Sequence, residues 1–209
     1  MARVELKKDA LVAIIVAAIE VYKKECYGLL VGEKGGNRTL IRDAFGFQTA
    51  MRDYYSSSVF EFRERRVNET LKLLTPWKLV GDFHSHTNGT ECLSDDDKDF
   101  LLEAGPGFVS LLVNISRTKK TSRWKYNVEK KALSGSIGRK FFVKVQAFIY
   151  DEKEDRIKKV PISFPKKDTL NRRMRYFTKL QRELEKARKE EKKSVRRKRR
   201  LKKKLSARE

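Results

Sequence analysis

The sequence predicts an α/β fold, a sandwich in which helices flank a mixed, largely antiparallel β-sheet. Strand-like apolar runs and segments of helical spacing alternate along residues 1–165. Turn-forming Gly, Pro and Asn residues separate these segments, and a mostly acidic segment at 151–155 joins 141–150 and 156–164 as a hairpin. A chain of 209 residues can hold one well-packed domain with an appended segment. We therefore expect a domain at 1–165 and a tail at 166–209.

The predicted domain opens with a short strand at 4–6 and an apolar helix. Asp9 precedes a run of Ala, Leu, Val and Ile, so we expect it to cap a helix that continues to about Lys24. The run is apolar on every side, which predicts a helix buried in the core.

Turn signals and apolar runs place the remaining elements. We expect a strand at 25–32 with a hairpin partner at 39–41, a helix at 60–74 ended by Pro76, a strand at 77–83, a helix after Ser94 that stops at 105–107, strands at 108–115 and 124–128, and a final hairpin of 141–150 with 156–164. The apolar positions of the helix at 60–74 are Phe62, Val67, Leu71 and Leu74. Residues 44–58 stay open between a loop that borders a substrate groove and a strand.

Both histidines of the chain, His84 and His86, stand two residues apart. If 79–83 is a strand, side chains two apart point to the same face, so the two imidazoles lie side by side. A hydrolytic zinc site takes three nitrogen or oxygen ligands and keeps one position open. Together with Asp97, the histidines supply such a set.

Two further residues belong to this pattern, and each has a structural alternative. Ser94 with Asp97, just before an apolar run, is also a helix-capping pair, and a capped helix start can hold Asp97 toward the strand. Glu25 starts an apolar run and can serve as a base for the proton of an activated water. From spacing alone, the favoured interpretation of Glu25 is a solvent-exposed residue at the start of a strand.

With these residues in hand, the chain resembles the JAMM (MPN-plus) zinc metalloproteases. That family is marked by a Glu before a Gly-Leu-Leu-x-Gly-like strand, then His-Ser-His, seven residues, Ser, two residues and Asp. The resemblance covers about residues 1–165 and implies a cytidine-deaminase-like sandwich. It also implies a Zn²⁺ ion, with roles for the matching residues: metal ligands His84, His86 and Asp97, general base Glu25, and oxyanion support from Ser94.

The resemblance implies an isopeptidase similar to deubiquitinases and archaeal desampylases. Its substrates would be conjugates in which a ubiquitin-like modifier is joined to a lysine. Thr87 stands where the family usually has Pro, which leaves the conformation of the following loop open. The alternatives are a catalytically silent scaffold of the same fold, a nucleic-acid-binding module that acts through the tail, and a metal-dependent peptidase with a different protein substrate.

The tail carries most of the net charge of +22. Residues 166–209 contain 21 Lys and Arg against 6 Asp and Glu, while residues 1–165 contain 29 against 22. Apolar residues from Leu170 to Ala187 recur at intervals of three and four, which predicts an amphipathic helix. The basic run at 196–204 should be disordered or marginally helical when free. Three roles stay open: a solubilising extension, contact with nucleic-acid phosphates, and recruitment of an acidic protein.

The two cysteines, Cys26 and Cys92, are too few for a secreted disulfide scaffold and indicate a reducing compartment. We expect Cys26 to be a small core residue, whereas Cys92 stays open between an inert and a redox-sensitive loop thiol. Lys7 and Lys8 before the first apolar run look like the start of a signal peptide, but the run is too short to cross a bilayer. The sequence therefore favours a buried helix, no membrane contact and a cytoplasmic protein.

Overall fold

The structure is a computed structural model that describes residues 2–47, 51–52, 57–59, 61–86, 90–164, 179, 182–183, 186–191 and 193. The chain divides into two compact units, Met1–Lys167 and Asp168–Glu209. The described residues of the second unit have helical backbone, while the predicted start of the tail helix near Thr169 and the basic run at 196–204 lie outside the described residues. Within the described part of the chain, every helix is too short or too polar to cross a membrane.

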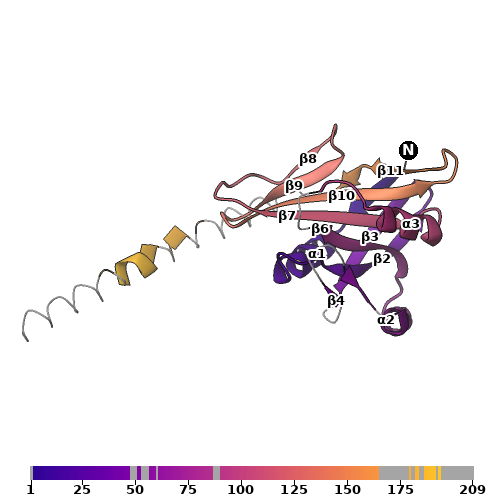
Figure 1. Cartoon of the computed structure of the whole chain (residues 1–209), viewed down its shortest axis with the longest axis horizontal. Helices are drawn as coiled ribbons and strands as arrows, with labels where there is room; N and C mark the ends of the chain where they lie inside the picture. Colours follow the sequence, from indigo (N-terminus) through magenta and orange to yellow (C-terminus); the bar gives the residue numbers. More distant parts are fainter. Residues whose placement is uncertain are drawn as a thin grey trace, which may run out of the picture. The chain divides into compact units, whose positions relative to one another are not determined.

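A ten-stranded sheet forms the centre of the first unit (Figure 1). Its strands are β1 (Arg3–Leu6), β2 (Tyr27–Gly35), β3 (Arg38–Gly46), β6 (Lys78–His86), β7 (Val109–Arg117), β8 (Lys125–Asn127), β9 (Ala132–Ile137), β10 (Phe141–Asp151), β11 (Arg156–Val160) and β12 (Ile162–Ser163). Their order is β12-β1-β3-β2-β6-β7-β10-β9-β8, with β11 paired to β10. Pairs β1–β12, β1–β3 and β6–β7 are parallel and the other described pairs are antiparallel, which confirms a mixed sheet.

Helices α1 (Lys8–Glu20), α2 (Glu61–Leu74) and α3 (Asp95–Ala104) cover the sheet. Leu71 of α2 packs with Leu29 of β2, and Leu101 of α3 packs with Leu112 of β7. Helix α1 contacts β3, β6 and β7. It lies close to β3, because a Cβ atom added to Gly46 would come within 2.9 Å of the Cβ atom of Ala17. The core therefore has helix-covered sheet at its centre, as an α/β sandwich requires.

Helix α1 differs from its prediction at both ends and on one face. Its N-cap is Lys7, without a side-chain cap hydrogen bond, and Asp9 lies inside the first turn. The helix ends at Glu20 because the chain turns at Lys23, whose φ is 80°. Val12 and Val16 are 42% and 60% exposed, so the expected all-round burial is wrong. A helix that lies on a sheet buries only the stripe that faces it.

The final hairpin is shorter than predicted because Pro161 interrupts its second strand. Proline has no N–H to donate to the ladder, so β11 ends at Val160. The Pro161 carbonyl instead accepts a hydrogen bond from the Val4 N–H at 2.9 Å, and β12 continues as the parallel partner of β1. Strand β9 was not predicted, since its centre is Ser134-Gly135-Ser136 rather than an alternating apolar run.

The segments around α2 also refine the prediction. Helix α2 ends at Leu74, before Pro76, as predicted, but Phe62 and Leu74 are exposed and Leu71 is its buried residue. The open segment 44–58 contains the end of β3 and two short paired strands, β4 (Met51–Arg52) and β5 (Ser57–Ser58). Residues 48–50 and 53–56 lie outside the described residues.

Candidate metal centre

Strand β6 carries the two histidines in the middle of the sheet. It pairs with β2 on one side and with β7 on the other. The strand continues to His86 rather than ending at Phe83, so both histidines belong to it. Their ring centroids are 5.1 Å apart, and both side chains are buried. A strand held by ladders on both edges is a rigid support for two adjacent imidazoles.

The third residue of the cluster, Asp97, comes from the first turn of α3. Ser94 is the N-cap of this helix: its Oγ accepts a hydrogen bond from the Asp97 N–H at 3.1 Å, and its own N–H donates to Asp97 Oδ2 at 2.8 Å. The Ser94 hydroxyl also donates to Oδ2 at 2.6 Å. This reciprocal pair is a capping box, as the Ser-x-x-Asp spacing predicts.

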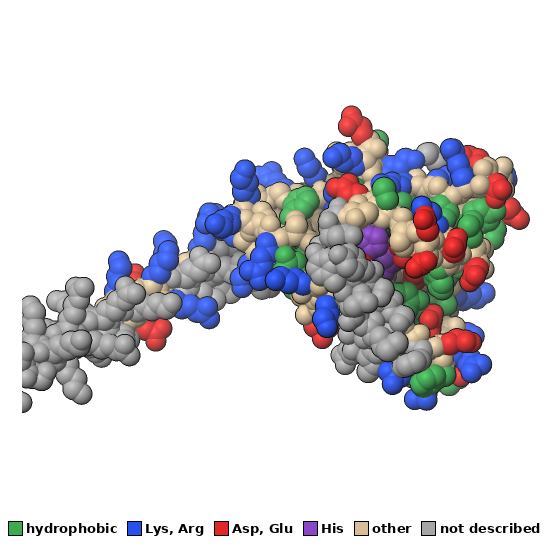
Figure 2. Space-filling view, in the orientation of Figure 1, with side chains coloured by type: hydrophobic (Ala, Val, Ile, Leu, Met, Phe, Trp, Pro, Cys, Tyr) green, Lys and Arg blue, Asp and Glu red, His purple; other side chains and the backbone are tan. Residues whose placement is uncertain are grey.

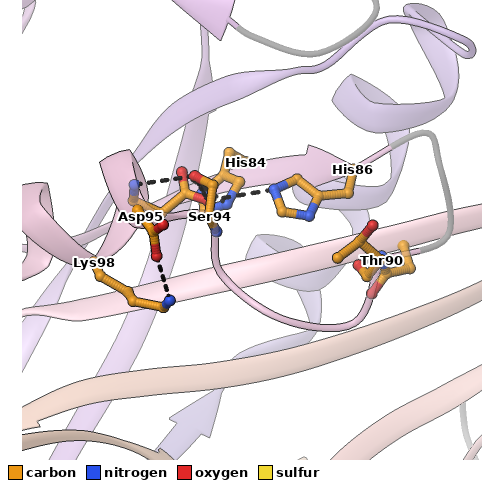
Figure 3. A network of polar contacts seen from close by, with 8 residues as sticks. His84, His86, Thr90, Ser94, Asp95 and Lys98 are labelled. Carbon is orange, nitrogen blue, oxygen red and sulfur yellow. Dashed lines mark hydrogen bonds and ion pairs between the residues drawn. The ribbon is translucent and has the colours of Figure 1, made fainter.

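The carboxylate of Asp97 contacts Ser94 and both imidazoles, and Figure 3 shows the side chain of Ser94 close to His84, with His86 beside them. Asp97 Oδ1 lies 3.4 Å from His84 Nε2, and Oδ2 lies 3.4 Å from His86 Nε2. One ligand atom from each of the three residues lies within 4.8 Å of the other two. The three side chains are therefore near enough to bind one metal ion.

The donor set fits a zinc ion. Two imidazole nitrogens and one carboxylate oxygen are ligands that zinc accepts, and three protein ligands leave a fourth position for water or substrate. His84 Nε2 is buried and makes no hydrogen bond to a described residue. A buried ring nitrogen in this state suits metal coordination, because an unsatisfied buried polar atom costs free energy.

Negative charge gathers around the cluster. Burial alone would lower the pKa of His84, but the carboxylates of Asp97, Asp82 and Glu25 outweigh it and raise that pKa. Burial would raise the pKa of Asp97, yet the two imidazoles hold it well below its usual range. Burial raises the pKa of Asp82 to about 6, although His84 acts in the opposite direction. A cation placed here would be stabilised by these carboxylates.

Glu25 lies beside the histidine strand. The neighbouring Cys26 N–H donates to Ser85 Oγ at 2.9 Å, and the Ser85 N–H donates to the Cys26 carbonyl at 3.1 Å. Tyr27, two residues after Glu25, pairs with His84 in the antiparallel ladder, and the Glu25 carboxylate is close enough to raise the pKa of His84. Glu25 is 7% exposed, and the prediction of a solvent-exposed residue is wrong.

The cysteines and Thr87 take different places. Cys26 is 1% exposed, which confirms a core position, whereas Cys92 is exposed. Thr87 and the Asn88-Gly89 turn lie outside the described residues.

Sequence reasoning missed a set of residues that hold the chain between His86 and α3. The Asn114 amide donates to the Thr90 carbonyl at 2.6 Å, and Lys144 forms an ion pair with Glu91. Gln146, fully buried, can donate its amide to the Glu91 carbonyl at 3.1 Å. The sequence signal that could have found them is an Asn or Gln within an otherwise apolar strand. Such a side chain is buried only where it has hydrogen-bond partners, so its presence indicates a polar contact with another segment.

Asn114 also adjoins the metal cluster through the ladder. It is the register partner of His86 on the parallel strand β7. His86 Nδ1 and Asn114 Oδ1 are both buried without a hydrogen-bond partner among the described residues. A ligating histidine usually donates its second ring N–H to such an oxygen, which fixes the tautomer and the ring orientation.

Comparisons with known proteins agree with this fold. Protein DSY2949 from Desulfitobacterium hafniense, whose structure was solved in solution, superimposes with a TM-score of 0.54, at 16% identity, over 77% of this chain and 92% of that one. This likeness concerns the fold alone. A search of curated proteins gives no match. The family described as prokaryotic homologues of the JAB domain matches residues 7–127, more than half of the chain. The chain therefore belongs to the prokaryotic homologues of the JAB domain.

Proposed function

We propose that this protein is a zinc-dependent metallopeptidase, a JAMM-type isopeptidase similar to desampylases, that removes ubiquitin-like modifiers from lysine. The observation that supports this most directly is the cluster of His84, His86 and Asp97, whose ligand atoms lie within 4.8 Å of one another. A buried carboxylate, Glu25, lies on the neighbouring chain segment. Ligands and a base are the minimum that metal-assisted hydrolysis needs.

Each side chain has a distinct task in this proposal. A zinc ion held by the three ligands supplies Lewis-acid chemistry, since it polarises a carbonyl and acidifies water. Glu25 accepts the proton of the attacking water and passes it to the leaving lysine amine. The hydroxyl of Ser94 orients Asp97, and it can support an oxyanion only after it turns away from that carboxylate.

The substrate class rests on the resemblance to JAMM proteases. An amide that joins a modifier's C-terminal glycine to a lysine presents a carbonyl and an amine leaving group, which match the tasks above. A silent scaffold would not need a complete ligand set, so the presence of all three ligands and of Glu25 favours an enzyme.

Metal binding tests the first half of the proposal. Purified protein, dialysed against trace Zn²⁺, should contain about one zinc per chain. Asp97→Asn should lose it, because an amide is a weaker ligand than a carboxylate. Asp96→Asn is the matched control, because Asp96 lies on the same helix turn and is exposed. Equal zinc content in both variants would remove Asp97 from the site.

Turnover tests the second half. The wild-type protein should release lysine from a panel of modifier conjugates, as detected by mass spectrometry, and a chelator should stop this. Glu25→Gln should retain zinc but lose at least 100-fold in rate, as expected when a general base is removed. Full activity of Glu25→Gln would exclude Glu25 as the base, and a zinc-loaded protein that cleaves no conjugate would refute the substrate class.

A further inference from the structure

A strongly basic surface lies at the end of the sheet where β8 is the last strand. We define the basic ribbon as Arg117–Lys144, which includes the last residue of β7, the strands β8 and β9, and the start of β10. These 28 residues contain ten Lys and Arg and one acidic residue, Glu129. The rest of residues 1–165 contains 19 Lys and Arg against 21 Asp and Glu. The positive charge of the domain is therefore concentrated in the ribbon.

Most of these cations are available to a partner. Eight of the ten are exposed: Arg117, Lys119, Lys120, Arg123, Lys125, Lys130, Arg139 and Lys140. Within the described residues, none of the eight forms an ion pair with a carboxylate. Figure 2 shows Lys and Arg gathered over β8, β9 and the adjoining ends of β7 and β10. Unpaired like charges repel one another, so such a surface destabilises the free protein unless an anion offsets it.

Backbone pairing places the cations along a line. The Thr118 N–H donates to the Lys140 carbonyl at 3.0 Å, which brings Arg117–Lys120 beside Arg139 and Lys140 at one end of the ribbon. Lys130 lies at the opposite end, in the turn between β8 and β9. Strand β9 has six residues, so the two ends are about 20 Å apart. That length spans about six phosphates along one strand of a duplex.

The ribbon is held rigidly by its own packing. The Ser122 N–H donates to Ser136 Oγ at 2.7 Å, and the Ser136 N–H donates to the Ser122 carbonyl at 3.2 Å. Trp124 is 2% exposed and covers Gly135, where a Cβ atom would lie 2.5 Å from the indole ring. The backbone that carries the cations of the loop 119–123 is therefore fixed before a partner arrives, which lowers the entropy cost of binding.

The exposed side chains of the basic ribbon are suited to bind a polyanion rather than a membrane. Its one exposed large apolar side chain among the described residues is Val128, and its indole, Trp124, is buried. A lipid surface is usually bound with apolar side chains that insert into it, and single-stranded bases are bound by stacking on exposed aromatics.

We propose that the basic ribbon binds the phosphate backbone of double-stranded nucleic acid without sequence preference. The proposal does not depend on the metal centre or on its activity. It concerns the folded domain and is separate from any contact that the basic tail makes. Binding through phosphates should weaken steeply with salt because neutralised phosphates release their counterions.

The test uses full-length protein, so the tail is the same in every sample. Binding to a labelled 20-base-pair DNA duplex is measured by fluorescence anisotropy between 50 and 300 mM salt. The ribbon variant carries Lys120→Gln, Arg123→Gln, Lys125→Gln and Arg139→Gln. The control variant carries Arg65→Gln, Lys72→Gln, Lys78→Gln and Lys153→Gln, four exposed residues outside the ribbon. Both variants lose the same net charge.

The ribbon variant should bind at least about tenfold more weakly at 50 mM salt, and its slope of log affinity against log salt should fall by about three to four. The control should stay near wild type, and so should a charge-preserving variant with Arg117→Lys, Arg123→Lys and Arg139→Lys. Equal affinities and slopes of the ribbon and control variants would overturn the proposal. A ribbon variant that loses binding only to phosphatidylserine vesicles would overturn it as well. Parallel measurements with duplex RNA identify which duplex is preferred.

Discussion

Replacing Ser94 by Ala separates two effects of one hydroxyl. As the acceptor from the Asp97 N–H at 3.1 Å, the oxygen caps α3. Loss of a serine cap costs about 1 kcal/mol in the free energy of unfolding. For a domain of this size, that lowers the melting temperature by roughly 2–4 °C. We expect this shift in chelator, where no metal contributes to stability.

The same hydroxyl donates to Asp97 Oδ2 at 2.6 Å, which orients the carboxylate toward the histidines. The Ser94 N–H keeps its own 2.8 Å contact with this oxygen in Ser94→Ala, so the carboxylate is only partly released. We therefore expect zinc affinity to fall by about tenfold, the lower end of the effect of removing a partner of a metal ligand. A competitive titration with a zinc chelator measures this change.

Ser94→Gly tells the two effects apart. Glycine is a tolerable N-cap and costs only a few tenths of a kcal/mol, so the melting temperature should stay within about 1 °C of wild type. The hydroxyl is absent in this variant too, and zinc affinity should fall as in Ser94→Ala. If Ser94→Gly binds zinc as tightly as wild type, the hydroxyl does not orient Asp97 and the reasoning fails.

Three further outcomes follow from the geometry. Asn114→Ala should weaken zinc binding by about tenfold and speed amide hydrogen exchange at residues 90–93. Unchanged zinc affinity and exchange rates would show that Asn114 supports neither the metal site nor this loop. Gly32→Ala should cost about 3 kcal/mol in urea unfolding, since its Cβ would lie 1.9 Å from the Leu40 carbonyl oxygen, and a smaller loss would mean that the strands separate easily. Lys144, through its hydrogen bond, lowers the pKa of Glu91 from 4.5. The stability that this ion pair adds to the folded protein is present above pH 4.5 and is lost as the pH falls through the lowered pKa of Glu91. Lys144→Met should therefore return the pKa of Glu91 toward 4.5, as measured by an NMR titration.

Local sequence patterns were enough for the parts of the site that depend on neighbouring residues. Alternation along β6 predicts that His84 and His86 share a face, and three-residue spacing predicts that Ser94 caps Asp97. Both patterns act over fewer than five residues. The end of α2 before Pro76 was predictable for the same reason.

Features set by distant residues could not be predicted in this way. Glu25 is buried because its neighbour Cys26 bonds to Ser85, 59 residues further along the chain. Strand β9 forms because it pairs with β10 and β8, and Trp124 fills the space over Gly135, although the Ser-Gly-Ser centre has little strand preference. Asn114 and Thr90 are 24 residues apart in the chain, and no periodic pattern in the sequence indicates their contact.

The three metal ligands are held with unequal rigidity, and this difference should govern how mutations act on the site. His84 and His86 belong to a central strand, which cannot shift without breaking the ladders to both β2 and β7. Asp97 belongs to α3, which begins after the loop that Asn114, Lys144 and Gln146 hold against the sheet. A substitution that breaks the ladders of β6 should therefore lower global stability, whereas loss of a side chain that holds the loop should lower metal affinity while the melting temperature in chelator changes little.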